Sequence, residues 1–146
     1  MKILEIRILP DPVLRMNSSF VDEITSSEVD LLKIMVYTMK VNNGIGLAAP
    51  QIGVTKRMIV LKNEKGRILK LINPEIVSSE GVGVMREGCL SVPGHEVEFE
   101  RPYEIVVVGK NEKNKETQIK AKGLTARVLQ HEIDHLSGKL IIDYRR

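Results

Sequence analysis

The pattern Gln130-His131-Glu132-Ile133-Asp134-His135 constrains the fold most, because it places two histidines four residues apart with a glutamate directly after the first. On an α-helix, positions i and i+4 lie on one face, turned only about 40° apart, so both imidazoles can bind one metal ion. The glutamate then lies beside the metal, where it can accept and donate protons. Apolar residues recur at helical spacing in the same stretch, at Leu124, Val128, Leu129 and Leu136. We therefore predict a metal-binding helix from about residue 124 to 136, ended by Gly138.

A short pattern of this kind also occurs by accident, as a polar patch on an exposed helix, so the remaining ligand matters. Residues 136–146 contain no His, Glu or Cys. A metzincin protease needs a third histidine six residues after His135, and Ile141 stands there. Peptidases that take a glutamate from a later helix need more chain than follows. The third ligand is therefore expected upstream.

Cys89, in the run from Glu87 to Ser91, is the best upstream candidate, because a thiolate is a strong ligand for zinc or ferrous iron. Most lone cysteines are small buried apolar residues, which is the competing interpretation. His95 is a rival ligand that we expect at the surface or at the rim of the site.

The glycine-rich segment from Gly44 to Gly53 follows a predicted helix instead of opening one, which makes it a poor phosphate loop. Its small residues allow a close approach of backbone or ligand. Gln51 supplies an amide that can donate to an oxygen. The competing interpretation is a tight connection without a chemical role.

Length and composition indicate one domain that spans residues 1–146. One cysteine excludes an internal disulfide, and no apolar run approaches the ~18 residues of a membrane span. We expect a cytoplasmic protein without a membrane partner. The net charge of +3 is compatible with work near nucleic acid but is no sign of specific nucleic-acid recognition.

The remaining patterns predict an α+β fold, with mostly antiparallel sheets packed around the metal-binding helix. Thr25 and Glu28 form a capping box before a helix over residues 26–41. Strands are expected over residues 57–61, 68–72, 103–108 and 118–122, between turn-forming segments.

Three motifs taken together resemble the peptide deformylases. They are the Gly-x-Gly-x-Ala-Ala-x-Gln loop at Gly44 to Gln51, the Glu-Gly-Cys-Leu-Ser strand at Glu87 to Ser91, and the Gln-His-Glu-x-Asp-His helix at Gln130 to His135. The likeness extends to residues 8–15, 72–74 and 100–102 and covers nearly the whole chain. Three motifs in this order are very specific to that family.

The resemblance implies a metal-dependent hydrolase that removes the formyl group from the N-terminal formylmethionine of newly made polypeptides and releases formate. Cys89, His131 and His135 would hold one divalent ion, naturally Fe²⁺, with zinc, nickel or cobalt able to replace it. A metal-bound water would be the nucleophile, and Glu132 the general base and acid.

Further residues take roles by the same resemblance. Gln51 and the backbone amide of Leu90 would stabilise the negative oxygen that develops on the formyl group. Ile45, Leu124 and Val128 would line the methionine pocket, and the backbone of Ile45 and Gly46 would pair with the substrate. Glu87 and Arg101 would form a structural ion pair, and Asp134 or a backbone carbonyl is hypothesised to orient a ligand histidine.

Two departures from the family pattern carry predictions. Glu96 stands seven residues after Cys89, where many bacterial relatives carry an arginine that contacts the substrate, so the preference beyond methionine or the affinity should differ. The long C-terminal helix of many relatives does not follow Tyr144, so only a transient ribosome encounter is expected.

Two alternatives to a deformylase are kept. One is a general zinc metallopeptidase, and the other is a basic ribosome- or RNA-associated protein with a structural metal.

Overall fold

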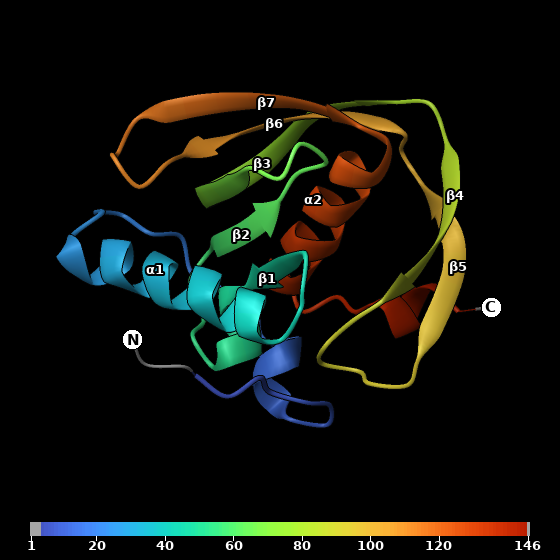
Figure 1. The fold of residues 1–146 in the computed structure, drawn as a ribbon, viewed down its shortest axis with the longest axis horizontal. Helices are drawn as coiled ribbons and strands as arrows, with labels where there is room; N and C mark the ends of the chain where they lie inside the picture. The colour runs from blue at the N-terminus through green and yellow to red at the C-terminus, as the bar shows by residue number, and fades with distance from the viewer. Residues whose placement is uncertain (1–3, 146) are drawn as a thin grey trace.

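The computed structural model describes residues 4–145, which form two α-helices, seven strands and three short 3-10 helices. Five strands make one antiparallel sheet in the order β1-β2-β3-β6-β7, and β4 and β5 make a separate hairpin. Figure 1 shows α2 between this sheet and the hairpin. The elements are η1 (Pro12–Arg15), α1 (Ser26–Val41), β1 (Gly46–Ala48), η2 (Ala49–Ile52), β2 (Met58–Lys62), β3 (Ile68–Glu80), β4 (Gly83–Gly88), β5 (Glu96–Arg101), β6 (Glu104–Lys110), β7 (Glu116–Lys122), α2 (Gly123–Leu136) and η3 (Ile141–Tyr144). The predicted α+β class with antiparallel sheets is confirmed.

Strand β2 separates the two main apolar clusters of the core. Successive side chains of a strand point to opposite faces, and in β2 both faces are covered. Met58 and Val60 pack with the buried residues of α1, whereas Ile59 and Leu61 pack with those of α2. This double coverage explains why four consecutive residues of β2 are fully apolar and buried.

Helix α1 begins and ends where the sequence predicts. The Thr25 side chain accepts a hydrogen bond from the Ser27 amide, and the Glu28 carboxylate accepts one from the Thr25 amide at 2.8 Å. This capping box satisfies amides that the first turn leaves without helical partners. Lys56 also binds Glu28, at 2.8 Å, and so ties the start of α1 to the loop before β2.

Helix α2 receives its N-terminal cap from a distant turn. The residue before it, Lys122, provides no side-chain cap. Instead the Glu64 carboxylate, on the turn between β2 and β3, accepts a hydrogen bond from the Thr125 amide, and the Thr125 hydroxyl accepts one from the Glu64 amide, both at 3.3 Å. The helix that carries the histidine pair is therefore fixed at its start by the five-stranded sheet.

The strands differ from the prediction mainly in β3, β4 and β5. Strand β3 continues to Glu80 instead of ending at residue 72, because Asn73 and Pro74 form an irregularity in the ladder with β6 rather than a turn. The sequence analysis missed the hairpin β4–β5. The predicted strand from Glu87 to Ser91 ends at Gly88, and the chain then turns, with the Val92 amide donating to the Cys89 carbonyl at 3.1 Å.

None of the helices between residues 4 and 145 is both long enough and apolar enough to span a membrane.

Candidate metal and active site

Two elements bring three potential metal ligands together. Helix α2 presents His131 and His135 one turn apart, and Cys89 follows the last residue of β4. One ligand atom from each residue lies within 4.8 Å of the other two, and Cys89 Sγ is 3.4 Å from His135 Nε2. Within residues 4–145 these three side chains are the one group of His, Cys, Asp and Glu that is spaced to hold a metal ion.

The charges around these side chains fit a divalent cation. Burial lowers the pKa of His135 well below its usual value, which keeps the ring in the neutral form that metals bind. Burial alone would also lower the pKa of His131, but the Glu132 carboxylate and the Cys89 sulfur outweigh it and raise this pKa to about 10. The negative groups around His131 therefore favour a positive charge at this ring. One sulfur and two imidazole nitrogens are a donor set that suits zinc or ferrous iron.

Glu132 lies beside the three ligands in the wall of a cavity of about 500 Å³. Its side chain is buried, and among the described residues no group forms a hydrogen bond with Oε1. Burial raises the pKa of Glu132 to about 7. A carboxyl group with a pKa near neutrality can both take up and release a proton during one reaction.

The residues proposed from the sequence converge on this cavity, with two exceptions. His135 lies behind the wall and is almost completely buried, whereas His95 is exposed and lies outside the ligand group. Ile45 and Leu124 are half exposed at the rim. The predicted residues in the lining are Ile45, Gly46, Gln51, Cys89, Leu90, Leu124, Val128, His131 and Glu132.

Gly46 gives the Glu132 carboxylate the space that it occupies. A β-carbon on Gly46 would overlap Glu132 Oε2 and would lie 2.9 Å from Val128 Cγ1. Any larger residue at this position in β1 must push the carboxylate or the backbone away. The need for glycine here is steric and does not come from an unusual backbone angle.

Gly46→Ala should therefore lower catalytic turnover by about 100-fold, the cost typical of a 1 Å displacement of a reacting group. Steady-state kinetics on the purified variant would measure this effect. Gly66→Asn is the control, because Gly66 lies on a turn where a β-carbon meets nothing nearer than 3.9 Å and asparagine tolerates the positive φ. Equal turnover in the Gly46 variant and the wild type would contradict the steric role.

Gln51 is held by hydrogen bonds at both ends of its amide. Its Oε1 accepts from the Ala48 amide at 3.0 Å, and its Nε2 donates to Ser91 Oγ at 3.1 Å. The same Nε2 lies 3.7 Å from Cys89 Sγ. Gln51 thus has a fixed orientation and presents an N–H group to the ligand cluster. The contact with Ser91 was not predicted, although this residue belongs to the same motif as Cys89.

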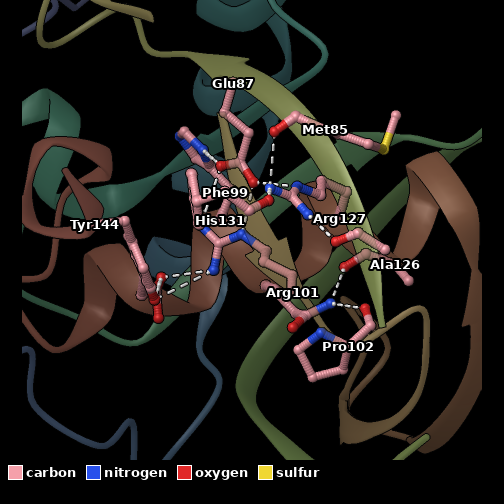
Figure 2. Close-up of polar contacts among 12 residues, drawn as sticks. Met85, Glu87, Phe99, Arg101, Pro102, Ala126, Arg127, His131 and Tyr144 are labelled. Carbon is pink, nitrogen blue, oxygen red and sulfur yellow. Dashed lines mark hydrogen bonds and ion pairs between the residues drawn. The ribbon is translucent and has the colours of Figure 1, made fainter. Parts of the chain in front are cut away.

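Glu87 connects the hairpin to a ligand histidine (Figure 2). The predicted ion pair with Arg101 is confirmed, with contacts of 2.6 and 3.0 Å. Glu87 Oε1 also lies 2.9 Å from His131 Nδ1, which leaves Nε2 of that ring for a metal. Burial by itself would raise the pKa of Glu87, but hydrogen bonds from His131 and Arg101 outweigh it and hold this pKa at about 2.

The hypothesis that Asp134 orients a ligand histidine is wrong. Asp134 Oδ2 instead accepts hydrogen bonds from Arg101 at 2.8 Å and from the Tyr144 hydroxyl at 2.7 Å. Its position next to His135 in sequence turns it away from the ligand face, because adjacent helical residues point about 100° apart. The orienting carboxylate comes from Glu87 on the other side of the cluster.

The fold and the site together define the class of metal-dependent hydrolases. Residues 3–146 match the family model described as polypeptide deformylase. The peptide deformylase of Halothermothrix orenii is 49% identical over 144 residues, which cover 98% of this chain and 94% of that protein. This chain belongs to the polypeptide deformylase family.

Solved structures agree with this assignment. The peptide deformylase of Ehrlichia chaffeensis, in complex with actinonin, has a TM-score of 0.97 at 39% identity, covering all of this chain and 90% of that one. The enzyme of Thermotoga maritima has a TM-score of 0.95 at 37% identity, covering 100% of this chain and 99% of that one.

Proposed function

We propose that this chain removes the N-formyl group from the N-terminal formylmethionine of newly made polypeptides and releases formate. Membership of the deformylase family supports this activity. The observation that carries the proposal is the position of Glu132, which lies beside the cluster of Cys89, His131 and His135 in the wall of one cavity. A proton carrier next to a metal site is the arrangement that amide hydrolysis requires.

Cys89, His131 and His135 would hold one divalent ion, and three protein ligands leave a position open, as catalytic sites require. Fe²⁺ is the proposed natural ion, with Zn²⁺, Ni²⁺ or Co²⁺ as substitutes. When bound, such an ion lowers the pKa of water from ~15.7 toward ~7, which makes hydroxide available at neutral pH.

Glu132 would accept the proton of the attacking water and then deliver it to the amine that leaves. Its pKa of about 7 favours this exchange at neutral pH. Gln51 Nε2 and the backbone amide of Leu90 would donate to the oxygen that becomes negative, and the loss of one such donor typically costs ~3 kcal/mol of barrier. The anchoring of Gln51 by Ala48 and Ser91 supports its part in this step, because its amide need not reorganise.

The substrate peptide would bind along the free edge of β1. Within residues 4–145, this strand is one of the two edge strands of the five-stranded sheet and pairs with β2 alone. The backbone of Ile45 and Gly46 would pair with an extended peptide as an added strand. The methionine side chain would lie against Ile45, Leu124 and Val128, which line the cavity.

The setting of the reaction follows from this substrate. Because its substrates are newly made polypeptides, the enzyme would work in the cytoplasm, as one domain that meets the ribosome transiently.

Glu96 is exposed and pairs with Gly88 across the hairpin, near the ligand Cys89. Substrates with basic residues after methionine should therefore be preferred over acidic ones.

The decisive assay measures formate release from formyl-Met-Ala-Ser by protein purified without air and loaded with iron or nickel. We expect formate from the loaded protein and background rates after a chelator has removed the metal, with recovery when the ion is added back. Unformylated Met-Ala-Ser is the control substrate and should remain intact. Absence of formate from folded, metal-loaded protein would contradict the proposed activity.

The same preparation tests the two alternatives. Cleavage of internal peptide bonds without formate release would favour a general zinc metallopeptidase. A ribosome- or RNA-associated protein with a structural metal would need a closed site of four protein ligands. The exposed His95 lies outside the ligand group and does not support such a site.

A further inference from the structure

Arg127 is a buried arginine that lies one helical turn before His131 on α2, and the sequence analysis overlooked it. Its side chain is only 5% exposed. Its Nε donates to Glu87 Oε2, and its two terminal nitrogens donate to backbone carbonyls of Gly83 and Met85, both at 3.0 Å, and of Phe99. Figure 2 shows Arg127 beside Met85, Glu87 and Phe99.

These acceptors come from both strands of the hairpin. Gly83, Met85 and Glu87 are alternate residues of β4, and Phe99 is on β5 opposite Met85. Arg127 therefore fixes most of the length of β4 to α2, up to two residues before the ligand Cys89. The Phe99 ring also lies under the guanidinium, 4.6 Å from its carbon, and adds a cation–π contact.

The three metal ligands belong to two separate parts of the fold. His131 and His135 are on α2, whereas Cys89 is in the loop that connects β4 and β5, and these two strands form their own two-stranded sheet. The spacing between the cysteine sulfur and the two rings thus depends on how the hairpin sits against the helix. Arg127 contacts both parts, and two hydrogen bonds, through Glu87, connect it to the ring of His131.

We propose that Arg127 is a positioning residue that holds the hairpin against α2 and so sets the distance between Cys89 and the two histidines. Arg127 is not one of the three ligands, although part of its side chain also lines the cavity. The inference rests on the proposed metal site. It adds that the contact between Arg127 and the hairpin holds the three ligands in place before the metal binds. An arginine is needed because its planar group offers five N–H donors in a fixed fork, whereas a lysine offers one compact charge.

The test compares Arg127→Met and Arg127→Lys with the control Arg57→Met. Arg57 also donates to backbone carbonyls, of Ser18 and Leu136, both at 3.2 Å, but its hydrogen bonds do not reach the hairpin. Each protein is titrated with Co²⁺ in competition with a chelator. The absorption band of the thiolate–cobalt bond is recorded at saturation, and thermal unfolding is measured without metal.

We expect Arg127→Met to bind Co²⁺ about 10- to 100-fold more weakly, which is the range typical when a residue that supports the metal ligands is lost. Its thiolate–cobalt absorption band should also be weaker. Arg127→Lys should lie between this variant and the wild type. Arg57→Met should unfold at a lower temperature but keep wild-type affinity and a full thiolate band. A purely structural role for Arg127 would not separate the two arginines in this way.

Wild-type affinity and a full thiolate band in Arg127→Met would overturn the inference. Should that variant fail to fold, the lysine variant decides: unchanged Co²⁺ affinity in Arg127→Lys would overturn it equally. Equal weakening in Arg57→Met would assign the effect to general loss of stability and also overturn it. If the wild type itself bound no Co²⁺, this result would contradict the proposed metal site, and the inference that rests on it as well.

Discussion

Glu132→Gln should bind metal like the wild type and yet lose turnover by about 10²- to 10⁴-fold, the contribution typical of a general acid–base group. Glutamine has the same shape as glutamate but cannot accept the proton of the attacking water. Glu132 is not one of the three clustered ligands, and Oε1 has no hydrogen-bond partner among residues 4–145. The substitution therefore removes the proton carrier and leaves the ligand cluster in place.

Metal analysis and formate release on the same sample would measure both expectations. Glu98→Gln is the matched control, because Glu98 is exposed on β5, and its turnover should equal that of the wild type. Substantial turnover in Glu132→Gln would show that another group carries the proton.

Cys89→Ala should lose both metal and activity. It removes the one ligand that the hairpin contributes and leaves two imidazoles one turn apart on a single helix. Loss of a residue that hydrogen-bonds to a metal ligand typically weakens metal binding by ~10- to 100-fold. We expect a larger loss of affinity here, because a direct bond to the metal is removed. Chelator competition with Co²⁺ would measure the affinity.

The protein without metal should keep its fold in this variant. Cys89 is only partly buried and packs at the margin of an apolar cluster that includes Leu14 and Val92, so alanine leaves little empty space. Thermal unfolding of the metal-free forms is the control and should give similar midpoints. Equal metal loss in Cys89→Ala and Glu132→Gln would contradict the separation of ligand and proton carrier.

The ligand cluster could be predicted because each of its ligands belongs to a recognisable sequence pattern. Two histidines at helical spacing indicate a shared face, and the absence of a ligand after His135 directs the search upstream to Cys89. The convergence of Gln51 on the same place could not be seen from spacing, since it depends on the folded loop. The resemblance of the three motifs supplied that part of the prediction.

The supporting contacts were harder to predict. Asp134, which was proposed together with a backbone carbonyl, is next to a ligand in sequence, whereas Glu87 reaches His131 from another element. Arg127 has the right helical spacing before His131, but a charged residue at such a position normally faces solvent. Only the hairpin carbonyls that surround it explain its burial.

The fold was predicted best where periodicity is local. Helix α1 agrees with its capping box and apolar spacing. Strand β4 was missed because it has glycines at both ends and no alternation of buried and exposed residues. Strand β3 was cut short because Asn73 and Pro74 usually mark a turn. In the structure, Asn73 instead binds the backbone of Val21, so a contact over 52 positions overrides the local signal.

The cap that Glu64 gives to α2 has a consequence for the order of assembly. A ribosome makes the chain from its N-terminus, so Glu64 and Cys89 both leave it before the residues of α2 do. A helix whose first-turn acceptor lies 61 positions earlier gains that stabilisation only after the sheet has formed. Helix α2 follows all seven strands in the chain and carries two of the three ligands, so the ligand cluster can assemble only after this helix has packed against the sheet.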